Sequence, residues 1–184
     1  MFSRYQSCAS NLLYKLLLNV LRYIKGTLDL CLTYYRDCND TVVGYVDSDW
    51  GGSSDRKSTT GYCFKVFGCS VIWVCKKQQT VALSSTEAEY VALSHATSEA
   101  CWLKSILYDF GFDVCPITIF EDNQSAIKMA HMASGTTRVK HLDIKQKFVK
   151  EKLDDKIIVI NYLSSSNQIA DVLTKPLGEL FLKV

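Results

Sequence analysis

Apolar side chains recur along this chain with two periods, and the changes of period predict where helices and strands lie. Over the first 26 residues the spacing is helical and predicts one helix, which Gly26 ends. A strand is predicted at 28–35, and the polar residues at 36–40 predict a turn and a domain boundary. The sequence therefore predicts an N-terminal helix and strand within residues 1–40.

Beyond this boundary, short apolar runs separated by polar loops predict an antiparallel meander with strands at 41–47, 61–67 and 70–75. Next come a long helix at 85–110 and a fourth strand at 116–120. Two helices at 123–132 and 140–153, a fifth strand at 156–163 and a short helix at 167–174 are predicted to follow. This order is typical of α/β proteins. It predicts a five-stranded mixed sheet with helices on both faces.

The long predicted helix begins with a capping-box pattern formed by Ser84 and Glu87. Small residues then recur every four positions along one side of it, at Ala88, Ala92, Ala96 and Ala100. Small side chains allow another element to approach closely, and a second side of the helix is also apolar. We therefore expect this helix to be central rather than peripheral.

The composition of the chain mainly argues against certain classes of site and partner. The net charge of +2 is too small to indicate a nucleic-acid partner by itself. The 8 cysteines include no C-x-x-C pair, and no histidine stands at zinc-finger spacing, so we expect reduced thiols in an intracellular protein rather than a zinc site. Since no apolar run is long enough to cross a bilayer, no membrane partner is expected.

Four acidic residues stand where predicted strands or helices begin or end: Asp47, Glu89, Asp122 and Asp171. Asp47 and Asp122 each follow an apolar strand, and ligand sites tend to lie beyond such strand ends. Carboxylates that converge there repel one another unless cations neutralise them, and Mg²⁺ does so through oxygen ligands. Paired metal ions on such a cluster suit in-line displacement at a phosphodiester.

Three neighbouring acids compete for these roles. Asp49 is an alternative to Asp47, but Asp47 is nearer the end of the predicted strand. Glu87 is an alternative to Glu89, but its capping-box position gives it a structural role. Glu121 directly precedes the third acid and is expected to point to the opposite face if the strand continues that far.

Six motifs follow one another along the chain: YVDSDWGG at 45–52, KSTTGY at 57–62, ALSSTEAEY at 82–90, DNQSA at 122–126, KHLDI at 140–144 and ADVLTKPL at 170–177. Together they closely resemble the ribonuclease H domain of copia-type (Pseudoviridae) retrotransposon Pol polyproteins. The resemblance covers about residues 41–178 and leaves 179–184 as a tail. RYIKGTLD at 22–29 also resembles the connection that follows the reverse transcriptase in these polyproteins.

This resemblance implies a ribonuclease H-like fold and an endoribonuclease that cuts the RNA strand of RNA–DNA hybrids during reverse transcription. In the family, the acids that match Asp47, Glu89, Asp122 and Asp171 bind two divalent ions, usually Mg²⁺, for which Mn²⁺ can substitute. Glu89 is expected to sense the ribose 2′-hydroxyl as well. Asp171 is expected to be the loosest ligand because it follows a serine-rich loop.

The implied partners are an RNA–DNA hybrid and a reverse transcriptase domain in the parent polyprotein. The implied location is intracellular, in a cytoplasmic virus-like particle or in the nucleus. Candidate contacts to nucleic acid are Ser48, Trp50, Lys57, Lys76, Lys77, Asn123, Lys140 and His141, with Arg56 and Lys145 as further basic candidates. Two of these have structural alternatives: Trp50 packing over a loop, and His141 forming a hydrogen bond at a helix end.

Two departures from related sequences keep an alternative open. Other ribonucleases H carry a histidine in the loop before the last acid, whereas this chain has serines and an asparagine at 164–167. The family usually has a Tyr-His pair where this chain has Gln146 and Lys147. The alternative is a catalytically inactive retroelement remnant that folds and binds nucleic acid. An integrase of the same fold fits less well, because here the glutamate is second and an aspartate last.

Overall fold

The computed structural model describes residues 2–34, 41–52, 55–132 and 140–175, without the side chains of 2–4, 140 and 141. The chain divides into two compact units, 1–34 and 35–184. In the first, a 3₁₀ helix, η1 (Phe2–Cys8), precedes α1 (Asn11–Gly26). The prediction of a single helix is therefore wrong, because Ser10 caps α1 by accepting a hydrogen bond of 3.3 Å from the N–H of Leu13.

Residues 28–34 form no strand, which corrects the prediction of a strand at 28–35 for the part that is described. The N–H of Leu30 bonds back to the carbonyl of Thr27 (3.1 Å), and this pairing makes a turn. Apolar composition alone does not make a strand, since a strand needs a neighbour for its backbone groups. The turn predicted at 36–40 lies outside the described residues.

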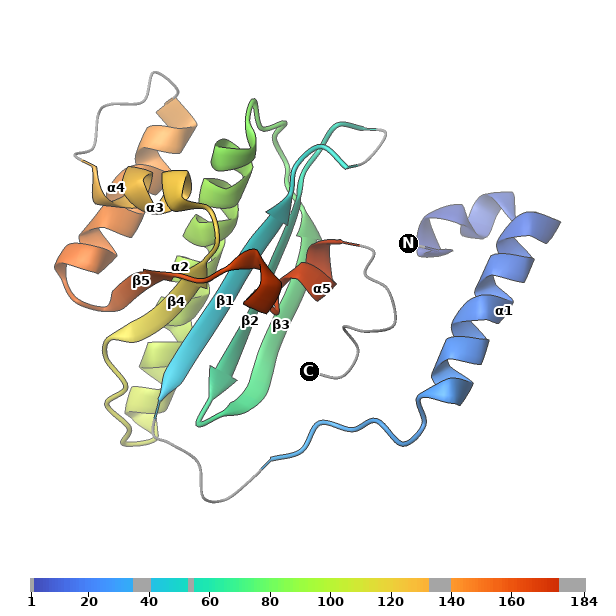
Figure 1. The fold of residues 1–184 in the computed structure, drawn as a ribbon, viewed down its shortest axis with the longest axis horizontal. Coiled ribbons are helices and arrows are strands. Elements are labelled where there is room, and N and C mark those ends of the chain that lie inside the picture. The colour runs from blue at the N-terminus through green and yellow to red at the C-terminus, as the bar shows by residue number, and fades with distance from the viewer. Residues whose placement is uncertain (1, 35–40, 53–54, 133–139, 176–184) are drawn as a thin grey trace. The chain divides into compact units, whose positions relative to one another are not determined.

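The second unit is built on a five-stranded mixed sheet in the order β3-β2-β1-β4-β5 (Figure 1). The pairs β1–β2 and β2–β3 are antiparallel, whereas β1–β4 and β4–β5 are parallel. The strands are β1 (Val42–Asp49), β2 (Thr59–Val66), β3 (Cys69–Lys77), β4 (Ile117–Glu121) and β5 (Ile158–Tyr162). The predicted mixed sheet is confirmed, and β1 occupies its centre.

Helix α2 (Ser85–Asp109) packs along one face of this sheet, behind it in Figure 1. Its alanine ladder is completely buried, as are Tyr90 and Leu93 of the same helix and Phe64 of β2. The capping box forms at its start: Ser84 Oγ accepts from the N–H of Glu87 (3.1 Å), whose carboxylate accepts from the N–H of Leu83 (2.8 Å). The predicted central helix is confirmed.

Two further helices, α3 (Gln124–His131) and α4 (Lys140–Asp154), pack against α2 and the β4–β5 side of the sheet. The short helix predicted at 167–174 is smaller than expected. A 3₁₀ turn, η2 (Ser165–Asn167), comes first, and α5 (Asp171–Thr174) follows it. Within the described part of the chain, no helix combines the length and apolar character needed to cross a membrane.

The opposite face of the sheet carries α5, in front of the strands in Figure 1. Tyr62 of β2 points toward α2, since its hydroxyl donates to Glu99 (3.0 Å). Its neighbour Gly61 therefore faces the other way. A Cβ atom at Gly61 would lie 2.6 Å from Thr174 Cγ2 and 2.9 Å from Leu173 Cβ, both in α5. Glycine thus allows α5 to lie directly on β2, and helices cover both faces as predicted.

Candidate metal centre

The parallel strands β1 and β4 separate at the edge of the sheet where two of the predicted acids lie. Their pairing ends at Tyr45 and Phe120. β1 continues alongside β2, where Asp47 pairs with Gly61. Asp122 directly follows the last residue of β4. Because these strands are parallel neighbours, both aspartates lie at the same edge.

Gln168 fills the place where the two strands separate. Its Nε2 donates to the backbone carbonyl of Val46 (2.9 Å) in β1 and to that of Phe120 (3.3 Å) in β4. The Gln168 side chain is buried, and its Oε1 accepts from the N–H of Ala170 (3.3 Å). This residue fixes the segment that leads into Asp171, and the sequence analysis missed it.

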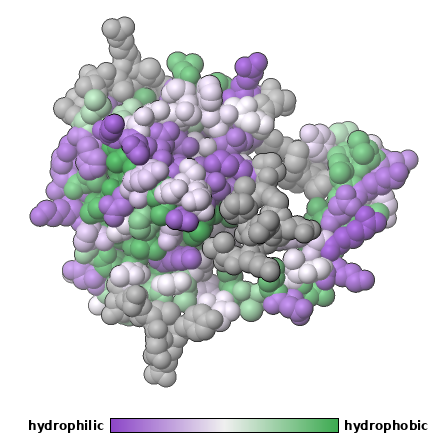
Figure 2. All heavy atoms as spheres, viewed as in Figure 1, coloured by the Kyte–Doolittle hydropathy of each residue, from purple (hydrophilic) through white to green (hydrophobic). Residues whose placement is uncertain are grey.

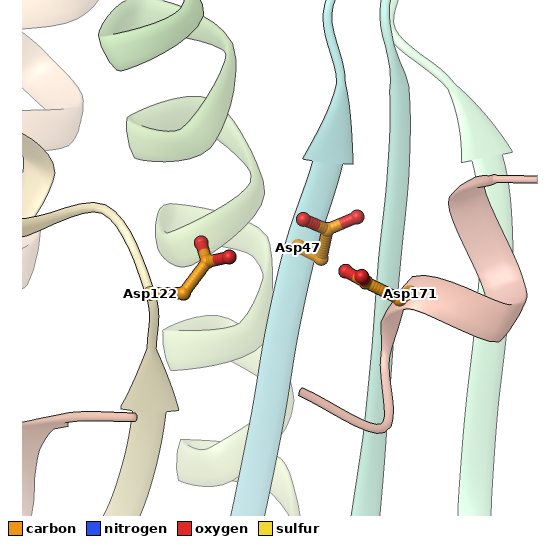
Figure 3. A group of neighbouring side chains, drawn as sticks. All are labelled: Asp47, Asp122 and Asp171. Carbon is orange, nitrogen blue, oxygen red and sulfur yellow. The ribbon is translucent and has the colours of Figure 1, made fainter. Parts of the chain in front are cut away.

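Three predicted acids come together around this edge (Figure 3). Asp47 lies on β1, Asp122 follows β4, and Asp171 begins α5. Each offers a carboxylate oxygen within 4.8 Å of the other two. Asp47 and Asp171 are buried, and Asp122 is half-buried. Residues far apart in the sequence thus form one carboxylate cluster.

The fourth predicted acid, Glu89 of α2, belongs to a second group with Glu121 and Asp122, whose ligand oxygens also lie within 4.8 Å of one another. Asp122 is common to both groups. Glu121 was expected to point to the opposite face only if the strand continued that far, and this condition is not met, because β4 ends at Glu121 and the chain bends at Asp122. Glu121 is fully buried and is a site residue that the sequence analysis set aside.

Burial and neighbouring carboxylates disfavour ionisation of the two glutamates in the second group. Burial, together with the charges of Glu121, Asp47 and Asp122, raises the pKa of Glu89 to about 10. Burial also raises the pKa of Glu121 well above its ordinary value, although the N–H of Asn123 donates to its Oε1 (2.9 Å). Among the described residues, Glu89 Oε2 and Glu121 Oε2 have no hydrogen-bond partner.

These observations fit a site for hard divalent cations. Every side chain in the two groups is a carboxylate, which is the ligand type that Mg²⁺ and Mn²⁺ accept. Within the described ranges, Glu89 Oε2 and Glu121 Oε2 are buried without a hydrogen-bond partner, and burying a polar oxygen in this way is costly. Burial also raises the pKa of Asp47, with the nearby charge of Asp171 acting in the same direction. A bound cation would favour the ionised carboxylates.

The chain itself supplies donors to the three aspartates. Lys175 Nζ lies 3.1 Å from Asp47 Oδ1 and 2.8 Å from Asp171 Oδ1. The hydroxyl of Thr174 donates to Asp47 Oδ2. Partial burial disfavours the charged ammonium of Lys175, but hydrogen bonds and charges from Asp171 and Asp47 outweigh this and raise its pKa. The i, i+4 spacing of Asp171 and Lys175 was the available sequence signal for this contact.

The serine-rich loop also reaches the aspartates. Ser165 Oγ donates a hydrogen bond of 2.6 Å to Asp122 Oδ2. This hydroxyl comes from the serine-rich segment at 164–167, which the sequence analysis singled out as a departure. Gln146, which the sequence analysis also singled out as a departure, fits into the protein interior. It is completely buried, and its Nε2 donates to the carbonyl of Met129 in α3 (3.2 Å).

Three of the residues predicted to contact nucleic acid lie within three residues of Asp47 or Asp122 in the sequence. Trp50 is 52% exposed, and its indole N–H donates to the carbonyl of Ala82 (3.0 Å), so it anchors a loop while much of its ring stays accessible. Asn123 caps α3 by accepting from the N–H groups of Ser125 (2.9 Å) and Ala126 (3.0 Å). Ser48 is buried, and its hydroxyl acts on the Glu89 carboxyl, where it opposes the rise in the pKa of that group.

The basic candidates are spread over several elements. Lys77 Nζ binds Asp55 (3.0 Å) and the carbonyl of Lys57 (3.3 Å). Lys76 lines a pocket of about 230 Å³ together with His95 and Glu99. Arg56 and Lys76 are exposed, and Lys57 is half-buried. The side chains of Lys140 and His141 are not among those that the structure describes. Lys145 reaches α2, where its Nζ lies 3.2 Å from Ser94 Oγ and 3.4 Å from His95 Nε2.

Hydrophilic side chains gather over the upper part of the face of the second unit shown in Figure 2, and hydrophobic ones are more frequent lower down. In the same orientation, β1 runs upward toward its carboxyl end (Figure 1). The more polar part of this face therefore lies toward the end of the sheet at which β1 brings in its aspartate.

Comparison with known sequences finds relatives among transposon proteins. The chain is 37% identical over 157 residues, 85% of its length, to the retrovirus-related Pol polyprotein from transposon TNT 1-94 of Nicotiana tabacum. It is 31% identical over 180 residues, 97% of its length, to that from transposon RE2 of Arabidopsis thaliana. It spans 12% of the length of each of these polyproteins. No family model matches the sequence.

Solved structures share the fold at low sequence identity. RNase H1 from the archaeon Halobacterium salinarum superposes with a TM-score of 0.52 at 22% identity, covering 73% of this chain and 94% of that one. LC11-RNase H1, solved in complex with an RNA/DNA hybrid, has a TM-score of 0.51 at 16% identity, with the same coverage of 73% and 94%. At such identities, these matches establish the fold alone.

Proposed function

Since this chain is homologous to copia-type, retrovirus-related Pol polyproteins and has the ribonuclease H fold, we propose that it is an endoribonuclease that cleaves the RNA strand of RNA–DNA hybrids. The observation that carries the proposal is the convergence of Asp47, Asp122 and Asp171 at the edge where β1 and β4 separate. Carboxylates from β1, from the end of β4 and from α5 meet there, and Glu89 of α2 lies beside Asp122.

Two divalent ions, Mg²⁺ or Mn²⁺, would supply an activated water and stabilise the leaving oxygen. Asp47, Asp122 and Asp171 would hold one ion, and Asp122 with Glu89 would hold the other. Gln168 would keep the β1 and β4 ends at their spacing, and Ser165 would orient the carboxylate of Asp122. The burial of Asp47 and Glu89 would limit competition from water for these ligands.

The proposed substrate is an RNA–DNA hybrid. LC11-RNase H1, which shares the fold, binds such a hybrid in its solved complex. The exposed ring of Trp50 lies three residues beyond Asp47 and would stack on a base or sugar. Exposed Lys76 and Arg56 would add salt-sensitive contacts to phosphates. A reverse transcriptase domain is the proposed partner, because the relatives are Pol polyproteins.

The direct test is cleavage of a hybrid with labelled RNA in Mg²⁺, in Mn²⁺ and in EDTA. We expect metal-dependent cutting that is lost in Asp47→Asn and Asp122→Asn, with circular dichroism showing retained folding. Asp154→Asn is the matched control, because Asp154 forms an exposed ion pair with Lys150 (2.7 Å) on α4. Cleavage that survives both substitutions would refute the assigned site.

One observation favours a second function, hybrid binding without cleavage. Lys175 and Thr174 already engage both carboxylate oxygens of Asp47, so the cluster is partly neutralised without a metal. A hybrid-binding assay in EDTA, paired with the cleavage assay, separates the two functions. Tight binding with no cutting in either metal would support the inactive remnant.

A further inference from the structure

We propose that Lys175 is an internal counter-ion of the metal centre, which a divalent cation displaces when it binds. This inference rests on the proposed function, because it concerns the same aspartates. It assigns a role to a residue outside the set of acids. One ammonium group lies between two carboxylates that come from different elements, β1 and α5.

The ammonium of Lys175 contacts one oxygen of each carboxylate. Its Nζ lies 3.1 Å from Asp47 Oδ1 and 2.8 Å from Asp171 Oδ1. The side chain of Asp47 is 1% exposed and that of Asp171 is 13% exposed, whereas that of Lys175 is 36% exposed. The lysine therefore enters the cluster from its solvent side and can leave without the core opening.

A charged lysine and a metal ion compete for these oxygens. An ammonium has three donors and no lone pair, so it cannot serve as a metal ligand. Two cations on the same carboxylate oxygens would also repel each other strongly at such short range. Binding of a divalent ion to Asp47 and Asp171 therefore requires the ammonium to leave.

The local structure permits this exchange without refolding. The backbone N–H of Lys175 donates to the carbonyl of Asp171 (2.8 Å), so the main chain of α5 is fixed independently of the side chain. Close packing of α5 over Gly61 holds the helix on β2. The lysine thus needs only to rotate about its own side-chain bonds, while Asp171 stays in place.

The test measures Mn²⁺ binding by calorimetry on the full chain, with Lys175→Met, Lys175→Arg and Lys150→Met compared with the unchanged protein. Loss of the competing charge should tighten Mn²⁺ binding to Lys175→Met by about tenfold, whereas Lys175→Arg should stay near the unchanged protein. Lys150→Met is the matched control, because Lys150 also forms an i, i+4 ion pair with an aspartate (2.7 Å). Its Mn²⁺ affinity should not change.

Thermal unfolding gives a second readout that is independent of catalysis. In EDTA, Lys175→Met should melt at a lower temperature than the unchanged protein, because Asp47 and Asp171 then lack a cation. Saturating Mn²⁺ should remove that difference. A purely structural lysine would instead leave a deficit in both conditions, which would overturn the proposal.

The unchanged protein also provides a test. With ¹⁵N-labelled lysine, the ammonium signal that Lys175→Arg removes identifies Lys175, and Mg²⁺ should shift it to the position of a solvent-exposed lysine. A signal that stays unchanged at saturating Mg²⁺ would overturn the proposal, as would equal or weaker Mn²⁺ binding by Lys175→Met. These results would leave the metal centre itself standing. Absence of Mn²⁺ binding in every protein would refute both the counter-ion and the proposed function.

Discussion

The side chain of Gln168 donates a hydrogen bond of 2.9 Å to the backbone carbonyl of Val46 and so ties the loop before α5 to the centre of the sheet. Gln168→Ala would leave this buried carbonyl and that of Phe120 without their donor. We expect the free energy of unfolding to fall by about 1–3 kcal/mol and metal-dependent cleavage to fall with it. Urea unfolding measures the first effect. Exposed Gln79→Ala is the control, and equal stability of the two variants would contradict this role.

Gly61→Ala tests whether α5 must lie directly on β2. The added Cβ would meet Thr174 Cγ2 at 2.6 Å and Leu173 Cβ at 2.9 Å, so α5 must shift away. We expect a stability loss of about 1–3 kcal/mol and weaker Mn²⁺ binding, because Asp171 moves with the helix. Gly26→Ala is the control, since no atom of the described residues lies within 4 Å of its added Cβ. Unchanged Mn²⁺ affinity in Gly61→Ala would show that the close contact is not needed.

The buried glutamates predict how the metal-free protein responds to pH. The pKa of Glu89 rises from 4.5 to about 10 on folding, so the native state binds more protons than the unfolded state between these values. Its contribution to stability is therefore fully present below about pH 4.5 and is lost as the pH rises toward 10. Glu121, whose pKa is also raised, acts in the same direction. In EDTA, urea unfolding from pH 5 to pH 9 should show declining stability.

Glu89→Gln and Glu121→Gln should each reduce this pH dependence, because the amide cannot ionise. Mg²⁺ should oppose the decline, since by the proposed function it would bind the ionised carboxylates and so stabilise the native state increasingly as the pH rises. Identical pH profiles for the variants and the unchanged protein would show that these glutamates are not the groups responsible.

Two substitutions at Trp50 distinguish a structural role of this residue from a role in binding nucleic acid. Trp50→Phe keeps an aromatic ring but removes the N–H that donates to Ala82, whereas Trp50→Ala removes both. If the exposed ring stacks on nucleic acid, Trp50→Ala should weaken hybrid binding by about 1–3 kcal/mol and Trp50→Phe by much less. Fluorescence anisotropy with a labelled hybrid measures this. Trp102→Ala controls for loss of a similarly exposed tryptophan, and equal affinity of all variants would exclude stacking.

The spacing of apolar and capping residues along the chain predicted the strands that lead to the aspartates and the start of α2. The strand preceding Asp47 and the strand preceding Asp122 alternate or run apolar in the sequence, and the capping residues of α2 stand at their expected spacing. Parallel neighbours then bring strand ends to one edge, so the meeting of these two aspartates followed from the order of elements. The prediction of a strand at 28–35 was wrong for the described residues, because a strand needs a neighbouring strand for its backbone groups and local sequence does not show whether one is present.

The remaining site residues depend on where the chain returns in space. Gln168 and Thr174 act on groups of β1 more than 120 residues earlier, and no spacing rule relates residues that far apart along the chain. For Lys175, the i, i+4 spacing indicates its contact with Asp171 but not its contact with Asp47. Glu121 was set aside on the condition that the strand continued beyond it, and the sequence does not show that β4 ends at this residue. Such residues become identifiable only when the register of β1 and β4 and the placement of α5 are known.

Because Asp122 belongs to both groups of acids, the two halves of the centre share a ligand. A cation bound at one half would change the charge of the oxygens offered to the other. Occupancy of one half would therefore be thermodynamically linked to occupancy of the other, and this linkage would be reciprocal. We expect a Mn²⁺ isotherm that two independent sites do not fit, and Asp122→Asn to disturb both halves at once.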